Sequence, residues 1–186
     1  SKKSIKRFVH VGSSDEYGNS PAPQVEEFRE QPISPYSFGK LANTHFLQML
    51  YRTERFPAII LRLFLTYGPN QDEKRFLPQV INACLRGEEF AASEGRQLRD
   101  FTYVKDVVSA IILALQTKEA EGHVLNIASG EPVSIRSIIE TVQKVIGGGR
   151  AQYGAIPYRP KENMTLYGST QKAKQLLGWS SKTTFQ

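Results

Sequence analysis

The chain has 186 residues, of which 40% are hydrophobic and 23% charged, and a formal net charge of +6. This length suits one domain or two small ones, and the composition is ordinary for a globular protein. No apolar run is long enough to cross a membrane, and the basic start lacks the apolar segment of a signal peptide. We therefore expect a cytoplasmic protein with no membrane partner.

The positive charge and the single cysteine limit the partners further. Basic residues form no long block and no nucleic-acid-binding motif accompanies them, so we expect an anionic small molecule rather than nucleic acid. Cys84 excludes an internal disulfide and fits a reducing compartment. Because Cys84 lies in an apolar stretch, we expect a buried small residue rather than a nucleophile, and we assign no metal ligands.

Strands and helices alternate along the chain, which predicts an α/β fold. Near-continuous apolar runs predict strands that are buried on both faces of a parallel sheet. These runs are 8–11, 58–64 and 124–128. Helical periodicity predicts helices at about 36–53, 77–86, 105–117, 135–146 and 169–177. Ser134 is the expected N-cap of the fourth helix, and Gly147 marks its expected end.

Tyr36 and Lys40 are the most informative pair in the sequence. They are four residues apart and therefore share one face of a helix. An ammonium group beside a phenol favours the phenolate and lowers the phenol's pKa from its usual value near ~10. Such a phenol can carry a proton to and from a sugar hydroxyl or carbonyl oxygen near neutral pH. The hydroxyl of Ser13, in the turn at 12–18, is the candidate that completes this site.

An apolar stripe on the same helix is expected to face the core. It consists of Phe38, Leu41, Ala42, Phe46, Met49 and Leu50. Tyr36 and Lys40 fall on the opposite side of the helix, so we do not expect them in its core. The alternative is a pair of ordinary surface residues, because this spacing often arises by chance. The serine turn upstream favours the catalytic interpretation.

One expected feature of a dinucleotide-binding fold does not occur in the sequence. Such folds open with a strand, a glycine-rich turn and a helix. Neither Gly-x-Gly-x-x-Gly nor Gly-x-x-Gly-x-x-Gly is present, and the glycines at 147–149 are better explained as the end of a helix. The chain also begins in a predicted strand, just before the serine turn. We therefore expect the C-terminal part of a longer enzyme.

Five motifs together resemble the nucleotide-sugar epimerase/dehydratase family of extended short-chain dehydrogenases/reductases. They are Ser-Ser-x-x-Tyr-Gly at 13–18, Pro-Tyr-x-x-x-Lys at 35–40, Leu-Arg-Leu-Phe-Leu-Thr-Tyr-Gly-Pro at 61–69, Arg-Asp-Phe-Thr-Tyr-Val-Lys-Asp at 99–106 and Asn-Ile-Ala-Ser-Gly at 126–130. The resemblance implies the C-terminal part of a Rossmann-type parallel sheet and a small mixed α/β substrate-binding subdomain. It also implies NAD or NADP as cofactor, a nucleotide-diphosphate sugar as substrate, and a homodimer or self-associating fragment.

The resemblance divides the chain into four segments. Residues 1–70 correspond to a partial NAD(P)-binding Rossmann region with the catalytic residues. Residues 71–103 form a substrate-binding segment, and 104–130 supply the returning Rossmann helix and strand. Residues 131–186 form a C-terminal substrate-binding subdomain.

The resemblance assigns catalytic roles by position. Ser13 would hydrogen-bond the sugar oxygen that is oxidised or reduced, and Tyr36 would be the acid/base. Lys40 would hold the nicotinamide ribose and tune the tyrosine. Asp15 stands where sugar 4,6-dehydratases have an acidic base, although it is one methylene shorter than their usual Glu. Glu16 fills a position that is usually apolar, and a turn or helix-cap role is the alternative for both acids.

Substrate binding is assigned in the same way. The resemblance places Ser14, Arg99 and Arg159 at the substrate, with the two arginines contacting its diphosphate. The alternative for either arginine is a surface salt bridge. Many members have Asn at the position of Leu65, where it contacts the diphosphate, so this contact is missing or replaced.

These inferences together predict an NAD(P)-dependent epimerase or 4-ketoreductase that transfers hydride at C4 of a nucleotide-diphosphate sugar. The serine turn resembles 4-ketoreductases and some epimerases more than dehydratases. A 4,6-dehydratase is the alternative within the class, and a cofactor-free binding or assembly module is the alternative from another class. We expect the chain to be inactive by itself.

Overall fold

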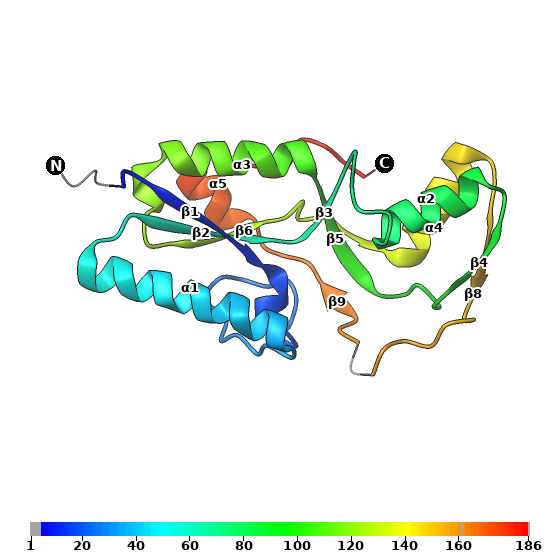
Figure 1. Ribbon diagram of the computed structural model, residues 1–186, viewed down its shortest axis with the longest axis horizontal. Coiled ribbons are helices and arrows are strands. Elements are labelled where there is room, and N and C mark those ends of the chain that lie inside the picture. The colour runs from blue at the N-terminus through cyan, green and yellow to red at the C-terminus, as the bar shows by residue number, and fades with distance from the viewer. Residues whose placement is uncertain (1–4, 161, 186) are drawn as a thin grey trace.

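A parallel sheet organises the larger lobe of the computed structural model, which describes residues 5–160 and 162–185 (Figure 1). Its strands are β1 (Phe8–Ser13), β2 (Ala58–Leu63) and β6 (Val124–Ile127), in the order β1-β2-β6. Ser13 at the end of β1 lies opposite Leu63 at the end of β2. All strands of this sheet run parallel, so the predicted strands and the α/β class are confirmed.

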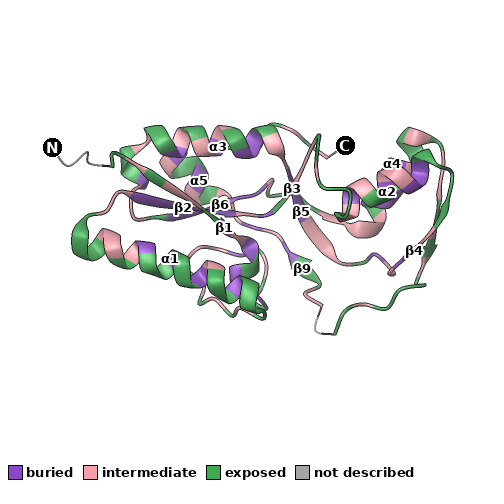
Figure 2. Cartoon of the chain, viewed as in Figure 1, coloured by how far each residue is buried: buried purple, intermediate pink, exposed green. Residues whose placement is uncertain are grey.

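Helices cover both faces of this sheet. Helix α1 (Pro35–Glu54) lies on one face, and α3 (Val104–Gln116) and α5 (Gln171–Leu177) lie on the other. Alternate residues of β2 point to opposite faces of the sheet. Ile60 packs with Leu47 of α1 in one apolar cluster, whereas Ile59 and Leu61 belong to a second cluster with residues of α3 and α5. Buried residues consequently run along β2 and β6 (Figure 2).

A smaller lobe is formed by two separate segments of the chain, one before and one after α3 and β6. It contains α2 (Phe76–Leu85), α4 (Ile135–Ile146), β4 (Glu89–Ala92) and β8 (Arg150–Tyr153). Cys84 is buried in the core of this lobe, where desolvation raises the pKa of its thiol, as expected for a packing residue. Ser134 caps α4 by accepting a hydrogen bond from Ser137 N–H, and α4 ends at Gly147, as predicted.

Short strands connect the two lobes. They are β3 (Leu65–Tyr67), β5 (Leu98–Tyr103), β7 (Pro132–Ser134) and β9 (Thr165–Leu166), and β5 pairs with each of the others. Sequence analysis did not reveal them, because they are short or mixed in polarity and none is the continuous apolar run that marks β1, β2 and β6. No helix within the described residues combines the length and apolar character that crossing a bilayer requires.

The predicted buried stripe of α1 is largely wrong. Its exposed members are Phe38, Ala42, Phe46 and Met49. The buried residues of the helix are Ser37, Leu41, Thr44 and Leu47. Polar contacts decide the orientation: Thr44 donates a hydrogen bond to the buried carboxylate of Glu16, and Ser37 shares a reciprocal cap with Ser34. The prediction that Tyr36 and Lys40 lie outside the core is confirmed.

Gly39 and Gly147 offer a matched test of the helix assignments. A Cβ atom at either position would meet nothing within 4 Å, but Gly39 is helical whereas Gly147 has a φ of +78°. Gly39→Ala should stabilise the protein by about 0.5–1 kcal/mol. Gly147→Ala should destabilise it by about 1–2 kcal/mol, because a Cβ is unfavourable in the left-handed region. Denaturant unfolding measures both changes, and the same sign for both would contradict the assigned conformations.

Strand β1 and helix α1 expose apolar surface together. Within the described residues β1 pairs only with β2, and its Phe8 and Val11 are each 38% exposed. An open strand edge beside the exposed face of α1 recruits further chains. We predict that the 186-residue chain self-associates and that Phe46→Glu lowers the associated fraction, as measured by light scattering. A monodisperse monomer for the unmutated chain would contradict this prediction.

Candidate active site

A cavity with a volume of about 1550 Å³ opens beside the carboxyl ends of β1 and β2, and residues of both lobes line it. The carboxyl ends of parallel strands are where α/β folds place their ligand sites. All seven residues that the sequence assigned to the site line this one cavity. They are Ser13, Ser14, Asp15, Tyr36, Lys40, Arg99 and Arg159. Their individual roles remain predictions.

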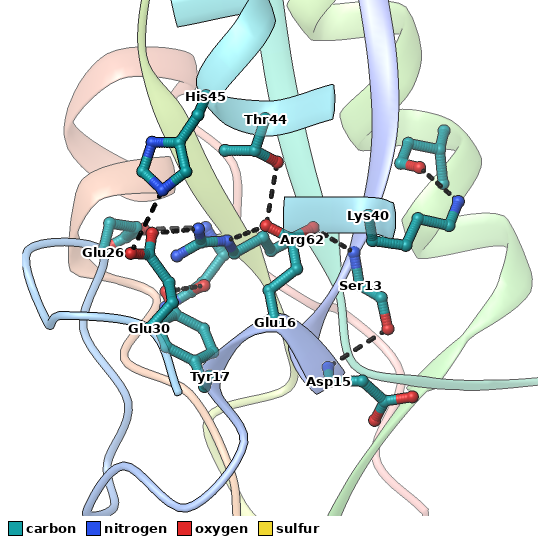
Figure 3. Close-up of polar contacts among 12 residues, drawn as sticks. Ser13, Asp15, Glu16, Tyr17, Glu26, Glu30, Lys40, Thr44, His45 and Arg62 are labelled. Atoms are coloured by element: carbon teal, nitrogen blue, oxygen red, sulfur yellow. Dashed lines mark hydrogen bonds and ion pairs between the residues drawn. The ribbon is translucent and has the colours of Figure 1, made fainter. Parts of the chain in front are cut away.

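The serine turn positions Ser13 through a capping box. The Ser13 Oγ accepts a hydrogen bond of 3.2 Å from the Asp15 N–H, and the Glu16 carboxylate accepts one of 2.9 Å from the Ser13 N–H (Figure 3). These bonds fix Ser13 where β1 passes into the 3-10 helix η1 (Ser14–Tyr17). The helix-cap alternative for Glu16 is therefore confirmed.

Asp15 differs from its neighbour because its carboxyl opens onto the cavity. Partial enclosure by the cavity walls raises the pKa of Asp15, while the nearby positive charges of Arg99 and Arg75 act in the opposite direction. A carboxyl with a raised pKa is a stronger base once it is ionised.

Helix α1 carries Tyr36 and Lys40 to the cavity. Ser34 caps the helix and Pro35 occupies its first position, so the Pro-Tyr motif is also the helix start. The Lys40 Nζ donates a hydrogen bond of 3.0 Å to the Val11 carbonyl oxygen and lies 5.9 Å from the centroid of the Tyr36 ring. The ammonium group therefore links the helix to β1 and lies next to the phenol.

Arg99 lines the cavity from β5 and also forms an ion pair. Its guanidinium donates to the Glu162 carboxylate and, at 2.8 Å, to the Leu98 carbonyl oxygen. Burial lowers the pKa of Arg99, although the charges of Glu162 and Asp15 oppose this effect. Both interpretations of Arg99 thus have a physical basis: it is salt-bridged, and it faces the cavity. Arg159 is exposed at the cavity wall.

Several residues near the site were not found by sequence reasoning. Arg75 lines the cavity, but it belongs to none of the five motifs. Leu65 also lies on the wall and is 38% exposed. Arg62 is 0% exposed and pairs with Glu16 and Glu30. The sequence did contain a signal for this ion pair: Arg62 lies within an apolar run, and a buried charge needs a partner of opposite charge.

Comparisons with known proteins identify the family of the chain. A family model described as GDP-mannose 4,6 dehydratase matches residues 1–186. An uncharacterized UDP-glucose epimerase of Bacillus subtilis (strain 168), YtcB, is 28% identical over 184 residues, which are 98% of this chain and 58% of that protein. A trifunctional UDP-glucose 4,6-dehydratase/3,5-epimerase/reductase of Arabidopsis thaliana is 30% identical, over 98% of this chain and 28% of that protein.

Solved structures show the same fold. UDP-glucuronic acid 4-epimerase from Bacillus cereus, in complex with UDP-glucuronic acid and NAD, has a TM-score of 0.89 at 30% identity, covering 97% of this chain and 58% of that one. RMD from Pseudomonas aeruginosa, complexed with NADPH, has a TM-score of 0.88 at 25% identity, covering 96% and 62%. The chain therefore belongs to the nucleotide-sugar epimerase/dehydratase family of extended short-chain dehydrogenases/reductases. It spans a little more than half the length of YtcB.

Proposed function

We propose that the protein carrying this chain is an NAD(P)-dependent epimerase or 4-ketoreductase that acts at C4 of a nucleotide-diphosphate sugar. The observation that carries the proposal is the meeting of Ser13, Tyr36 and Lys40 with two arginines around one cavity. Hydroxyl, phenol and ammonium groups serve proton transfer to a sugar oxygen, and arginines suit phosphate. Relatives with bound NAD or NADPH support the cofactor class.

The residues present fit one end of this cofactor. The Lys40 ammonium has donors beyond the one given to Val11, and these would hold the nicotinamide ribose beside Tyr36. The sequence has no glycine-rich turn, so the chain's own residues fit the nicotinamide end and not the phosphates. When bound, the nicotinamide would accept a hydride from the sugar C4 or return it.

Residues of this chain would also transfer the proton of the sugar oxygen. In the oxidising direction, the Tyr36 phenolate would take the proton of the sugar hydroxyl as the oxygen becomes a carbonyl. In the reducing direction, the Tyr36 phenol would give that proton back to the oxygen. Ser13 would orient the oxygen by a hydrogen bond, and the charge of Lys40 would favour the phenolate. Arg99 and Arg159 would hold the substrate diphosphate.

The position of Asp15 supports a second candidate function, that of a 4,6-dehydratase. Its carboxyl lines the cavity, and partial burial raises its pKa, which suits a base for a carbon-bound proton. Such an enzyme would remove water from the sugar, whereas an epimerase or ketoreductase would not. Mass spectrometry of the product from a nucleotide-diphosphate hexose distinguishes the two reactions.

Substituting Tyr36 tests the acid/base assignment in the full-length enzyme. Tyr36→Phe removes a proton relay and leaves the ring in place, so kcat should fall at least roughly a hundredfold with little change in substrate affinity. Tyr51→Phe on the same helix is the matched control, because Tyr51 does not line the cavity. Steady-state kinetics decides: activity of Tyr36→Phe within a few-fold of the parent would rule out the assignment.

Substitutions of Arg99 and of its ion-pair partner Glu162 test whether Arg99 binds the substrate diphosphate. Arg99→Ala should weaken binding of the nucleotide sugar by about 1.5–3 kcal/mol, the usual contribution of a charged hydrogen bond, and leave binding of the free nucleoside unchanged. Glu162→Gln removes the charge that competes for Arg99, so it should bind the nucleotide sugar at least as tightly as the parent. Calorimetry measures both. Equal losses for nucleoside and nucleotide sugar would mean that Arg99 is structural.

A further inference from the structure

The Glu16 carboxylate is buried beneath the cavity and accepts hydrogen bonds from three elements. Its Oε1 accepts from the Ser13 N–H at 2.9 Å. Its Oε2 accepts from the Thr44 hydroxyl at 2.8 Å and from the Arg62 Nε at 2.8 Å (Figure 3). The whole residue is 0% exposed. A helix cap alone requires only the first of these bonds.

The backbone makes room for this carboxylate. Gly12 precedes Ser13 on β1, and a Cβ atom at this position would lie 2.6 Å from the Glu16 Oε1. A side chain there would displace the carboxylate from the Ser13 N–H, so glycine and glutamate form a complementary pair. The missing side chain at Gly12 thus leaves a defined space for the Glu16 carboxylate.

Arg62 is the cation that pairs with the Glu16 carboxylate. Arg62 is also 0% exposed, and its Nη2 donates to the Glu30 carboxylate at 2.5 Å. The Tyr17 ring lies 4.5 Å from the guanidinium carbon, and burial raises the pKa of Tyr17 to about 12, so this phenol is neutral. Burial alone would lower the pKa of Arg62, but its phenolic and anionic neighbours outweigh that effect and raise it. Arg62 therefore stays charged between two carboxylates.

The two carboxylates differ in what else they contact. Glu30 also approaches His45 at 3.6 Å, on the exposed part of α1. Glu16 instead contacts Ser13 and Thr44, and Thr44 lies one helical turn after Lys40. Glu30 could neutralise Arg62 alone, whereas Glu16 is the carboxylate that ties the serine turn to the helix carrying Tyr36.

The geometry points to Glu16 as a positioning residue, which fixes the Ser13 hydroxyl relative to Tyr36 and Lys40. This inference rests on the proposed function, because it assigns these residues to proton transfer. The carboxylate does not line the cavity, so it acts through Ser13 and α1 and not on the substrate. Small displacements of reacting groups lower the rate strongly while substrate affinity is preserved.

Glu16→Gln in the full-length enzyme tests the inference with little change in shape. An amide placed with its NH₂ at Oε2 opposes the Arg62 donor, and one placed with NH₂ at Oε1 opposes the Ser13 donor. Because two donors meet Oε2 and only one meets Oε1, the orientation with NH₂ at Oε1 is favoured, and it breaks the bond to the Ser13 N–H. Glu30→Gln is the matched control, because it also removes one anionic partner of Arg62 but leaves Ser13 and Thr44 untouched. Thr44→Val removes the helix contact without altering any charge.

We expect Glu16→Gln to lower kcat roughly tenfold or more with KM within twofold of the parent. Glu30→Gln should retain most of kcat, although both variants should melt at lower temperature. Thr44→Val should reproduce part of the kcat loss, and it decides the question if Glu16→Gln does not fold. Equal kcat values for Glu16→Gln and Glu30→Gln, or a loss that appears only in KM, would overturn the inference.

Hydrogen exchange separates this inference from the proposed function. The Ser13 amide should exchange faster in Glu16→Gln than in the parent and in Glu30→Gln, whatever reaction the enzyme catalyses. A parent enzyme that does not act on nucleotide sugars, together with faster exchange at Ser13, would overturn the proposed function and retain the tether. Unchanged exchange at Ser13 would overturn the tether itself.

Discussion

The buried ion pair between Glu16 and Arg62 is the contact on which the arrangement of the site depends. Arg62 lies in β2 among apolar residues, where an unpaired charge would be strongly unfavourable. Its partners come from the serine turn and from the segment before α1, so neutralising one arginine brings both segments to the end of β2. The carboxyl end of the sheet therefore carries a fixed polar cluster directly beneath the cavity.

The same cluster explains the orientation of α1. Maximal apolar burial would turn Phe38 and Phe46 toward the sheet, but the helix instead presents Thr44 to Glu16 and Lys40 to the Val11 carbonyl. The polar contacts leave an apolar stripe exposed. They also place Tyr36 and Lys40 at the border between the buried face and the cavity, where a side chain can reach both a strand end and a ligand. Site geometry thus prevails over hydrophobic pattern in this helix.

The sequence predicted the features that depend on local pattern. The strands β2 and β6 are continuous apolar runs, and the Tyr36–Lys40 pair follows from helical spacing, so each was accessible before the fold was known. The face of α1 that is buried could not be predicted in this way. It depends on a hydrogen bond between Thr44 and Glu16, which are 28 residues apart in the chain. The partners of Arg62 were hidden for the same reason. Periodicity reports which residues can share a face, and long-range polar contacts select the face that is buried.

The proposed reaction would depend on a few side chains on the cavity wall. Relatives that share the fold at 25–30% identity include epimerases and dehydratases, so the scaffold does not specify the chemistry. In the proposed mechanism, Tyr36 and Lys40 would serve an oxygen-bound proton in any of these reactions. Asp15 is the group that could serve a carbon-bound proton, and its pKa reflects a balance between burial and the charges of Arg99 and Arg75. A substrate diphosphate bound at Arg99 would weaken the cationic influence on Asp15 and strengthen it as a base, so substrate binding and carboxylate basicity are physically coupled in this cavity.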